Sequence, residues 1–282
     1  MMQELAWMNA ALGGVLGLLV GSFLNVVIYR LPKMLERQWA SECAELAGKP
    51  LEPASGKFNL LVPRSRCQKC GHGIRWYENI PVISYVVLRG KCSSCGTPIG
   101  LRYPAVELAT GLLFGYCAWR WGLTWPTVFW WGFSAVLLAL GLIDWDTTLL
   151  PDDMTLPLVW AGLIAAALQL TSVSLPSALW GAVAGYLSLW LIYWAFKLVT
   201  GKEGMGYGDF KLLAALGAWF GWQGLVPIIL MASVIGAIIG IALKFNQGLR
   251  EGGYVPFGPF LAGAGLTAMI FGPQAILAAV GL

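Results

Sequence analysis

Hydrophobic and polar residues follow one another along this chain in long blocks, with polar loops between extended apolar runs. Eight apolar segments are present, at 8–29, 105–119, 125–143, 154–171, 177–198, 210–221, 224–244 and 258–281. Runs of this kind are typical of membrane-spanning helices, although several are shorter than the roughly 20 residues that cross a bilayer comfortably. The pattern predicts an all-α polytopic membrane protein with about eight transmembrane helices.

One sizeable polar region interrupts this pattern. We therefore expect a first transmembrane helix in 1–30, a polar insert in 31–104 and a transmembrane core in 105–282. Within the insert, 35–46 has the pattern of a short amphipathic helix lying on the membrane. The rest of the insert is rich in proline, which favours loops, turns and short strands.

Composition supports the membrane class. Hydrophobic residues make up 58% of the 282 residues and charged residues only 11%, far from a soluble average. The net charge of +4 needs no nucleic-acid partner, because membrane topology and contact with anionic lipid account for it.

The basic residues predict the orientation. Twelve of the 18 Lys and Arg lie between Arg30 and Arg102, and only Arg120 falls on the opposite side of an eight-helix arrangement. Because cytoplasmic loops carry the excess of positive charge, the insert faces the cytoplasm and both termini lie outside.

Four cysteines form two C-x-x-C motifs in the insert. They are Cys67, Cys70, Cys92 and Cys95. This spacing suits tetrahedral thiolate coordination of a structural zinc ion, whereas disulfides are disfavoured in a reducing cytoplasmic loop. The only histidine, His72, could replace a cysteine ligand, but a solvated loop histidine is the simpler interpretation.

Two aspartates lie beside apolar runs. Asp144 ends the run 130–143, and Asp209 closes a Gly-Tyr-Gly-Asp stretch just before the run 210–219. Ionisable groups at the edge of hydrocarbon are costly and usually functional, and a carboxylate pair sharing a proton can activate water to cleave a peptide bond. Asp146 is expected to be more solvated than Asp144.

Simpler interpretations of these acids exist. Asp152 or Asp153 could cap the next helix, and Asp209 could be the N-cap of its own helix. Intramembrane acids also suit a proton-coupled transporter, although their place at the membrane edge and the lack of an inverted repeat disfavour it. A zinc-stapled assembly factor without catalysis would leave both aspartates unexplained.

Several ordered motifs together carry a resemblance to a family. They are Gly21-Ser22-Phe23-Leu24-Asn25-Val26-Val27 with Arg30-Leu31-Pro32, the paired C-x-x-C motifs, Glu78-Asn79-Ile80-Pro81, Arg102-Tyr103-Pro104 with Glu107-Leu108, Ile143-Asp144 through Leu150-Pro151-Asp152, Gly206-Tyr207-Gly208-Asp209-Phe210-Lys211 and Pro256-Phe257-Gly258-Pro259. The chain resembles the type IV prepilin peptidases over nearly its whole length.

The resemblance implies a bifunctional enzyme of the bacterial inner (cytoplasmic) membrane. Such enzymes cut the basic leader from type IV prepilins and type II secretion pseudopilins, then methylate the new N-terminus with S-adenosylmethionine. Asp144 and Asp209 match the catalytic aspartates of this family. The resemblance also implies zinc on the four cysteines. No dinucleotide-type glycine fingerprint places the methyl donor, whose site stays open between the insert and its junction with the bilayer.

Overall fold

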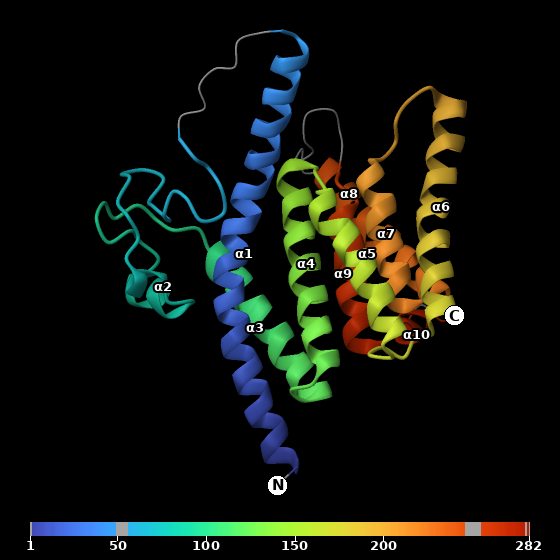
Figure 1. The fold of residues 1–282 in the computed structure, drawn as a ribbon, viewed down its shortest axis with the longest axis horizontal. Coiled ribbons are helices and arrows are strands. Elements are labelled where there is room, and N and C mark those ends of the chain that lie inside the picture. Colours follow the sequence, from blue (N-terminus) through green and yellow to red (C-terminus); the bar gives the residue numbers. More distant parts are fainter. Residues whose placement is uncertain (1, 49–55, 246–254, 280, 282) are drawn as a thin grey trace. The chain divides into compact units, whose positions relative to one another are not determined.

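The computed structural model describes residues 2–48, 56–245, 255–279 and 281, and these form helices and loops with no β-strand. The described chain divides into two compact units, Met1–Thr127 and Val128–Leu282, which we consider one at a time. Figure 1 shows the order of the helices along the chain. The all-helical prediction is confirmed for this part of the chain.

The first unit begins with one long helix. α1 runs Met2–Leu46 and contains Pro32 in its interior. The separate surface helix predicted for 35–46 is therefore wrong, because this segment continues α1. Proline removes one backbone hydrogen bond, but the residues beyond it are rich in strong helix formers, which favour continuation of the helix.

Glycines let α1 pack closely against α3, which runs Arg102–Trp121. A Cβ at Gly17 would lie 2.6 Å from the Thr110 carbonyl oxygen, and one at Gly21 would lie 2.7 Å from the Glu107 Cα. The Asn25 amide donates to the Tyr103 carbonyl at 3.1 Å. These small residues therefore serve tight packing between the two helices.

Between the end of α1 at Leu46 and the start of α3 at Arg102, the described part of the insert contains only short helices, η1 at Trp76–Asn79 and α2 at Ile83–Val87. Two buried charged side chains hold it to the α1/α3 pair. Arg30 donates to the carbonyls of Asn59 and Pro63, at 2.9 and 2.6 Å. Glu107 accepts the backbone N–H of Val82 at 2.7 Å. The insert is therefore fastened to the helices through hydrogen bonds to its backbone, with little apolar core of its own.

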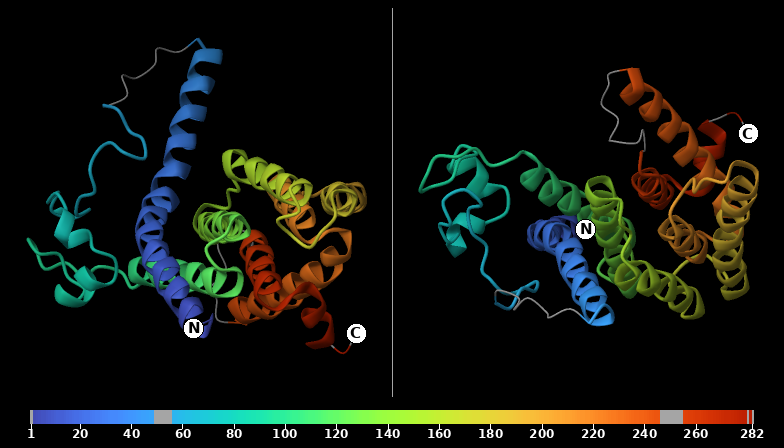
Figure 2. Two further views of the ribbon diagram at one scale, coloured as in Figure 1. Left: turned by 60° about the horizontal axis from the view of Figure 1, so that its bottom comes forward. Right: turned by 90° about the horizontal axis from the view of Figure 1, so that it is seen from above.

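The second unit consists of α4 from Val128 onward and all helices that follow it. The bounds are α4 Trp125–Thr147, α5 Asp152–Ala167, α6 Leu175–Thr200, α7 Tyr207–Phe220, η2 Trp222–Gly224, α8 Leu225–Phe245, α9 Gly258–Phe271 and α10 Pro273–Ala279. α7 contacts α5, α6 and α9 and lies inside this bundle (Figure 2).

Close contacts bury α7 on nearly every side. A Cβ at Gly185 of α6 would lie 2.6 Å from the Leu213 carbonyl oxygen of α7. On the α5 side, the Trp219 indole donates to the Leu158 carbonyl at 2.9 Å and packs over Gly162. With 14 residues, α7 is only about 21 Å long. It is shorter than a hydrocarbon core of about 30 Å, so other helices must cover it.

Within the described residues, four helices are long and apolar enough to cross a membrane, namely the apolar part of α1, α4, α6 and η2 joined to α8. A fifth span results if α9 and α10, bent by 102°, count as one. Each of the eight predicted apolar segments coincides with helix in the described residues. The exact number of eight crossings stays a prediction.

Candidate active site and metal centre

The two predicted aspartates come together in the second unit. Asp144 lies one turn before the end of α4, and Asp209 lies in the first turn of α7. Each is only 4% exposed. They are close enough that the charge of Asp144 acts on the Asp209 carboxyl. Two interacting, desolvated carboxyls favour a state in which one is ionised and the other keeps its proton.

Asp209 is held by the start of its helix but does not cap it. Gly206 occupies the N-cap position without any capping side chain, and the Asp209 amide donates to the Gly206 carbonyl at 3.3 Å. The simpler interpretation of Asp209 as an N-cap is therefore wrong. The carboxyl is buried in the first helical turn, where the helix dipole stabilises negative charge.

Glycines around the pair serve close packing. Gly206 and Gly208 have no positive φ, so their value is not an unusual backbone conformation. A Cβ at Gly208 would lie 2.6 Å from the Leu150 Cβ, and one at Gly258 would lie 2.5 Å from Asp144 Oδ2. Leu150 also faces Gly258, at 3.1 Å from the same hypothetical Cβ. The two glycines thus allow Leu150 and the start of α9 to close around the carboxyls.

The other acids of this region lie outside the buried pair. Asp146, Asp152 and Asp153 are all exposed, as expected for Asp146. Asp152 accepts both of its hydrogen bonds from Lys211 Nζ, at 2.6 and 2.7 Å, which links α5 to α7. Pro151 is the N-cap of α5, so neither Asp152 nor Asp153 is its cap, contrary to that alternative.

The four cysteines of the insert form one cluster in the first unit. Their sulfurs all lie within 4.8 Å of one another, and Cys67 Sγ is 3.8 Å from Cys95 Sγ. Four thiolates around one zinc at about 2.3 Å lie about 3.8 Å apart in a tetrahedron. All four cysteines are free thiols rather than disulfides. The donor set therefore fits a tetrahedral metal ion.

The backbone builds two equivalent knuckles around this cluster. In the first, the Cys67 amide donates to the His72 carbonyl and Gly71 has φ +74°. In the second, the Cys92 amide donates to the Thr97 carbonyl and Gly96 has φ +68°. Glycine tolerates this left-handed conformation without strain, which explains its place after each second cysteine.

His72 lies beside this cluster but does not belong to it. Its Nε2 is 3.3 Å from a Glu78 carboxylate oxygen and 3.4 Å from the Ser93 hydroxyl. The histidine is partly buried. It therefore joins the first knuckle to η1 and to the second knuckle, a contact that the sequence did not predict.

Comparisons with known proteins identify the family of the chain. The model of the bacterial peptidase A24 N-terminal domain matches residues 15–121, and that of the type IV leader peptidase family matches 131–241. The chain is 56% identical to the prepilin leader peptidase/N-methyltransferase of Stutzerimonas stutzeri, covering 96% of this chain and 93% of that protein. The chain belongs to the type IV leader peptidase family.

Other members of the family are almost as similar. The prepilin leader peptidase/N-methyltransferase of Pseudomonas aeruginosa is 56% identical over 92% of this chain and 89% of its own length. The protein of that name from Aeromonas hydrophila is 50% identical over 95% and 92%. No solved structure matches the chain. These matches confirm the predicted family and the predicted function as a bifunctional enzyme. Together with the long apolar helices, they indicate a multi-pass membrane protein.

Two residues around the carboxyls were not singled out from the sequence. Each was noted only as part of a family motif, Leu150 in the one that runs from Ile143-Asp144 through Leu150-Pro151-Asp152 and Gly258 in Pro256-Phe257-Gly258-Pro259. The structure places Gly258 against Asp144, and it places Leu150 against Gly258 and Gly208. The sequence signal for Gly258 was a small residue between two prolines near a helix start. This signal could not reveal its neighbour Asp144, which lies on a helix far away in the sequence.

Proposed function

We propose that Asp144 and Asp209 are the catalytic pair of a prepilin leader peptidase. The single observation that carries this is the burial of two interacting carboxyls at one place in an otherwise apolar bundle. One carboxylate takes a proton from a water molecule, and the other, protonated, donates to the carbonyl of the scissile peptide. The two groups titrate as one coupled pair.

The substrates are the basic-leader prepilins of type IV pili and the pseudopilins of type II secretion. The name of the relatives supports prepilins, and the family resemblance extends this to pseudopilins. After cleavage, the same protein methylates the new N-terminal amine with S-adenosylmethionine. The word N-methyltransferase in the relatives' names supports this second activity.

The insert, 31–104, is proposed to be a zinc-binding domain, beside a first transmembrane helix in 1–30 and a peptidase core in 105–282. Cys67, Cys70, Cys92 and Cys95 hold one zinc ion, which leaves no open position for water and is therefore structural. The ion supplies a cross-link to a region with little core of its own.

The protein is proposed to lie in the bacterial inner membrane with eight crossings. The insert and both aspartates face the cytoplasm, because the basic residues gather in the insert and in the loops after the fifth and seventh segments. Of these residues, Arg250 lies outside the described part of the chain. The apolar side chains exposed on α6 and α8 are suited to lipid contact.

Cleavage of a prepilin peptide tests the proposal against a proton-coupled transporter. Purified protein is incubated with a peptide carrying a basic leader and an apolar segment, and the products are weighed by mass spectrometry. Leader release that is lost in Asp144→Asn and in Asp209→Asn supports the catalytic pair. Release that persists in both variants assigns peptidase activity to other residues, and pH-driven transport without cleavage favours the transporter.

A further inference from the structure

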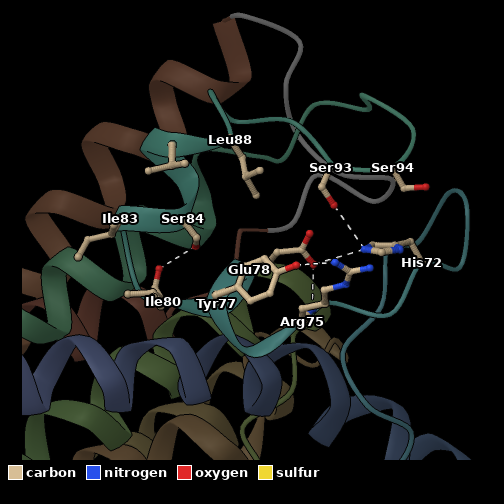
Figure 3. Close-up of a pocket in the computed structure, with 11 residues that line it drawn as sticks. His72, Arg75, Tyr77, Glu78, Ile80, Ile83, Ser84, Leu88, Ser93 and Ser94 are labelled. Carbon is tan, nitrogen blue, oxygen red and sulfur yellow. Dashed lines mark hydrogen bonds and ion pairs between the residues drawn. The ribbon is translucent and has the colours of Figure 1, made fainter.

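A cavity of about 540 Å³ lies in the insert beside the cysteine cluster. Its size falls in the range of small-molecule sites, roughly 300 to 1,000 Å³. Figure 3 shows its lining, which comes from the first knuckle with η1, from α2 and from the second knuckle. The lining residues are His72, Arg75, Tyr77, Glu78, Ile80, Ile83, Ser84, Val87, Leu88, Ser93 and Ser94.

One end of the cavity carries a fixed negative charge. The Glu78 side chain is only 8% exposed, and its carboxylate accepts the Arg75 backbone N–H at 2.8 Å and lies 3.3 Å from His72 Nε2. The hydrogen bond from the Arg75 backbone is the main reason that the pKa of Glu78 is lowered to about 2. The carboxylate is thus ionised and held in place at neutral pH.

The remaining walls of the cavity carry a cation, an aromatic ring, hydroxyl groups and an apolar surface, which suit a ligand with both polar and apolar parts. The Arg75 guanidinium bonds the Tyr77 hydroxyl at 2.5 Å, so a cation and an aromatic ring lie together. Ser84 and Ser93 bring hydroxyl groups, and α2 brings an apolar wall that includes Val87. Val87 is 73% exposed, although an apolar side chain gains by being covered.

We propose that this cavity binds S-adenosylmethionine. The donor has an ammonium for Glu78, a carboxylate for Arg75, ribose hydroxyls for the serines, and an adenine for the apolar wall and Tyr77. The inference rests on the proposed N-methylation. The new N-terminal amine forms its bond to the methyl carbon while the sulfur–methyl bond breaks. S-adenosylhomocysteine leaves, and the amine releases one proton to solvent.

The cavity also gives the cysteine cluster a role in methylation. Glu78 follows the first knuckle and Ser93 belongs to the second, and His72 contacts both. Because the two sides of the cavity come from separate knuckles, the ion that joins the knuckles also keeps the cavity in shape.

Binding to the whole purified protein tests this site, with S-adenosylhomocysteine as an unreactive probe in calorimetry. Val87→Trp places a large ring in the cavity. Val86→Trp is the matched control, since Val86 is the preceding residue of α2, is 67% exposed and does not line the cavity. We expect at least a tenfold weaker Kd for Val87→Trp and less than a twofold change for Val86→Trp.

A second variant, Glu78→Gln, tests the charge. Glutamine keeps an oxygen to accept the Arg75 N–H, so the local fold is retained while the anion is lost. We expect at least tenfold weaker binding, with leader cleavage and metal content unchanged.

The outcomes separate this site from the proposed activity. If wild-type protein neither binds the probe nor methylates a cleaved pilin, N-methylation itself is wrong. If wild-type protein binds but Val87→Trp and Glu78→Gln bind within twofold of it, the donor lies elsewhere. Equal losses in Val86→Trp and Val87→Trp also overturn the site, because they show no dependence on the cavity.

Discussion

The buried aspartates and the cysteine cluster represent two different ways to build a site. Asp144 and Asp209 come from separate helices, are each 4% exposed, and meet only because the bundle packs around them. The four cysteines come from two local turns and are exposed or partly exposed. Apolar packing holds the first site, and the proposed zinc ion would hold the second.

This difference follows from the surroundings of each site. α7 is buried over most of its length by α5, α6 and α9, so its first turn has a fixed position. The insert has few buried apolar side chains among its described residues, and it relies on Arg30, Glu107 and the knuckles. Small regions without a sufficient core need such a staple. Substitutions at one site should therefore affect mainly the unit that contains it, and the kind of effect should differ between the two units.

The largest expected effect is loss of cleavage in Asp144→Asn and in Asp209→Asn. Each swap keeps the shape of the side chain but removes its ionisable proton, and general acid–base catalysis contributes about 10²- to 10⁴-fold. We expect the rate of leader cleavage to fall at least about 100-fold. Asp146→Asn, which alters an exposed acid, should retain most of the activity. Retention of more than about a tenth of the rate would remove that aspartate from the pair.

The Asp209→Asn variant also tests whether cleavage and methylation use separate sites. Asp209→Asn, given an already cleaved pilin, should still methylate its N-terminal Phe, because methyl transfer needs an aligned amine and donor rather than the carboxyl pair. The methyl group is counted by mass spectrometry. Loss of both activities in a folded sample would mean that the sites share residues.

Loss of metal is expected when one cysteine of each knuckle is replaced. Cys67→Ser with Cys92→Ser leaves two thiolates, which is too few for a tetrahedral site. Elemental analysis should find about one zinc per wild-type chain and little in the variant. Limited proteolysis should then cut the insert first while the α4–α10 bundle survives. Zinc retained at the wild-type level would contradict the ligand set.

A smaller effect is expected from Gly258→Ala. The new Cβ would lie 2.5 Å from Asp144 Oδ2 and 3.1 Å from Leu150 Cδ1, so the carboxyl or the start of α9 must shift. Displaced catalytic groups lose rate steeply, and we expect about a tenfold slower cleavage. Gly263→Ala, in the same helix with no atom within 4 Å of its Cβ, is the control and should cleave normally. Equal rates for the two variants would place Gly258 outside the active site.

The smallest effect is expected from breaking the ion pair between Lys211 and Asp152. Its side chains are 25% and 54% exposed, so water and salt screen the attraction. We expect Lys211→Met and Asp152→Asn each to lower the free energy of unfolding by at most about 1 kcal/mol. The double variant should cost less than the sum of the two. A much larger loss would show that this contact holds α7 in place.

Much of the molecule followed from the sequence because local chemistry decides it. Apolar runs predicted the helices, since helix formation satisfies the backbone in lipid. The C-x-x-C spacing predicted the cysteine cluster, because each pair needs only one turn of backbone to bring its sulfurs together. The order of motifs predicted the family, which the relatives confirm.

Other features depended on the tertiary structure. The amphipathic pattern of 35–46 did not reveal that α1 passes through Pro32 without ending, because helix continuation depends on the whole segment. The glycines just before Asp209 have no positive φ, and Gly208 instead makes room for Leu150. Gly258 lies against Asp144 although the helices of these two residues are far apart in the sequence. Sequence alone determined which groups are candidates for the chemistry. Packing decided which of them meet, because burial depends on neighbours that no local pattern records.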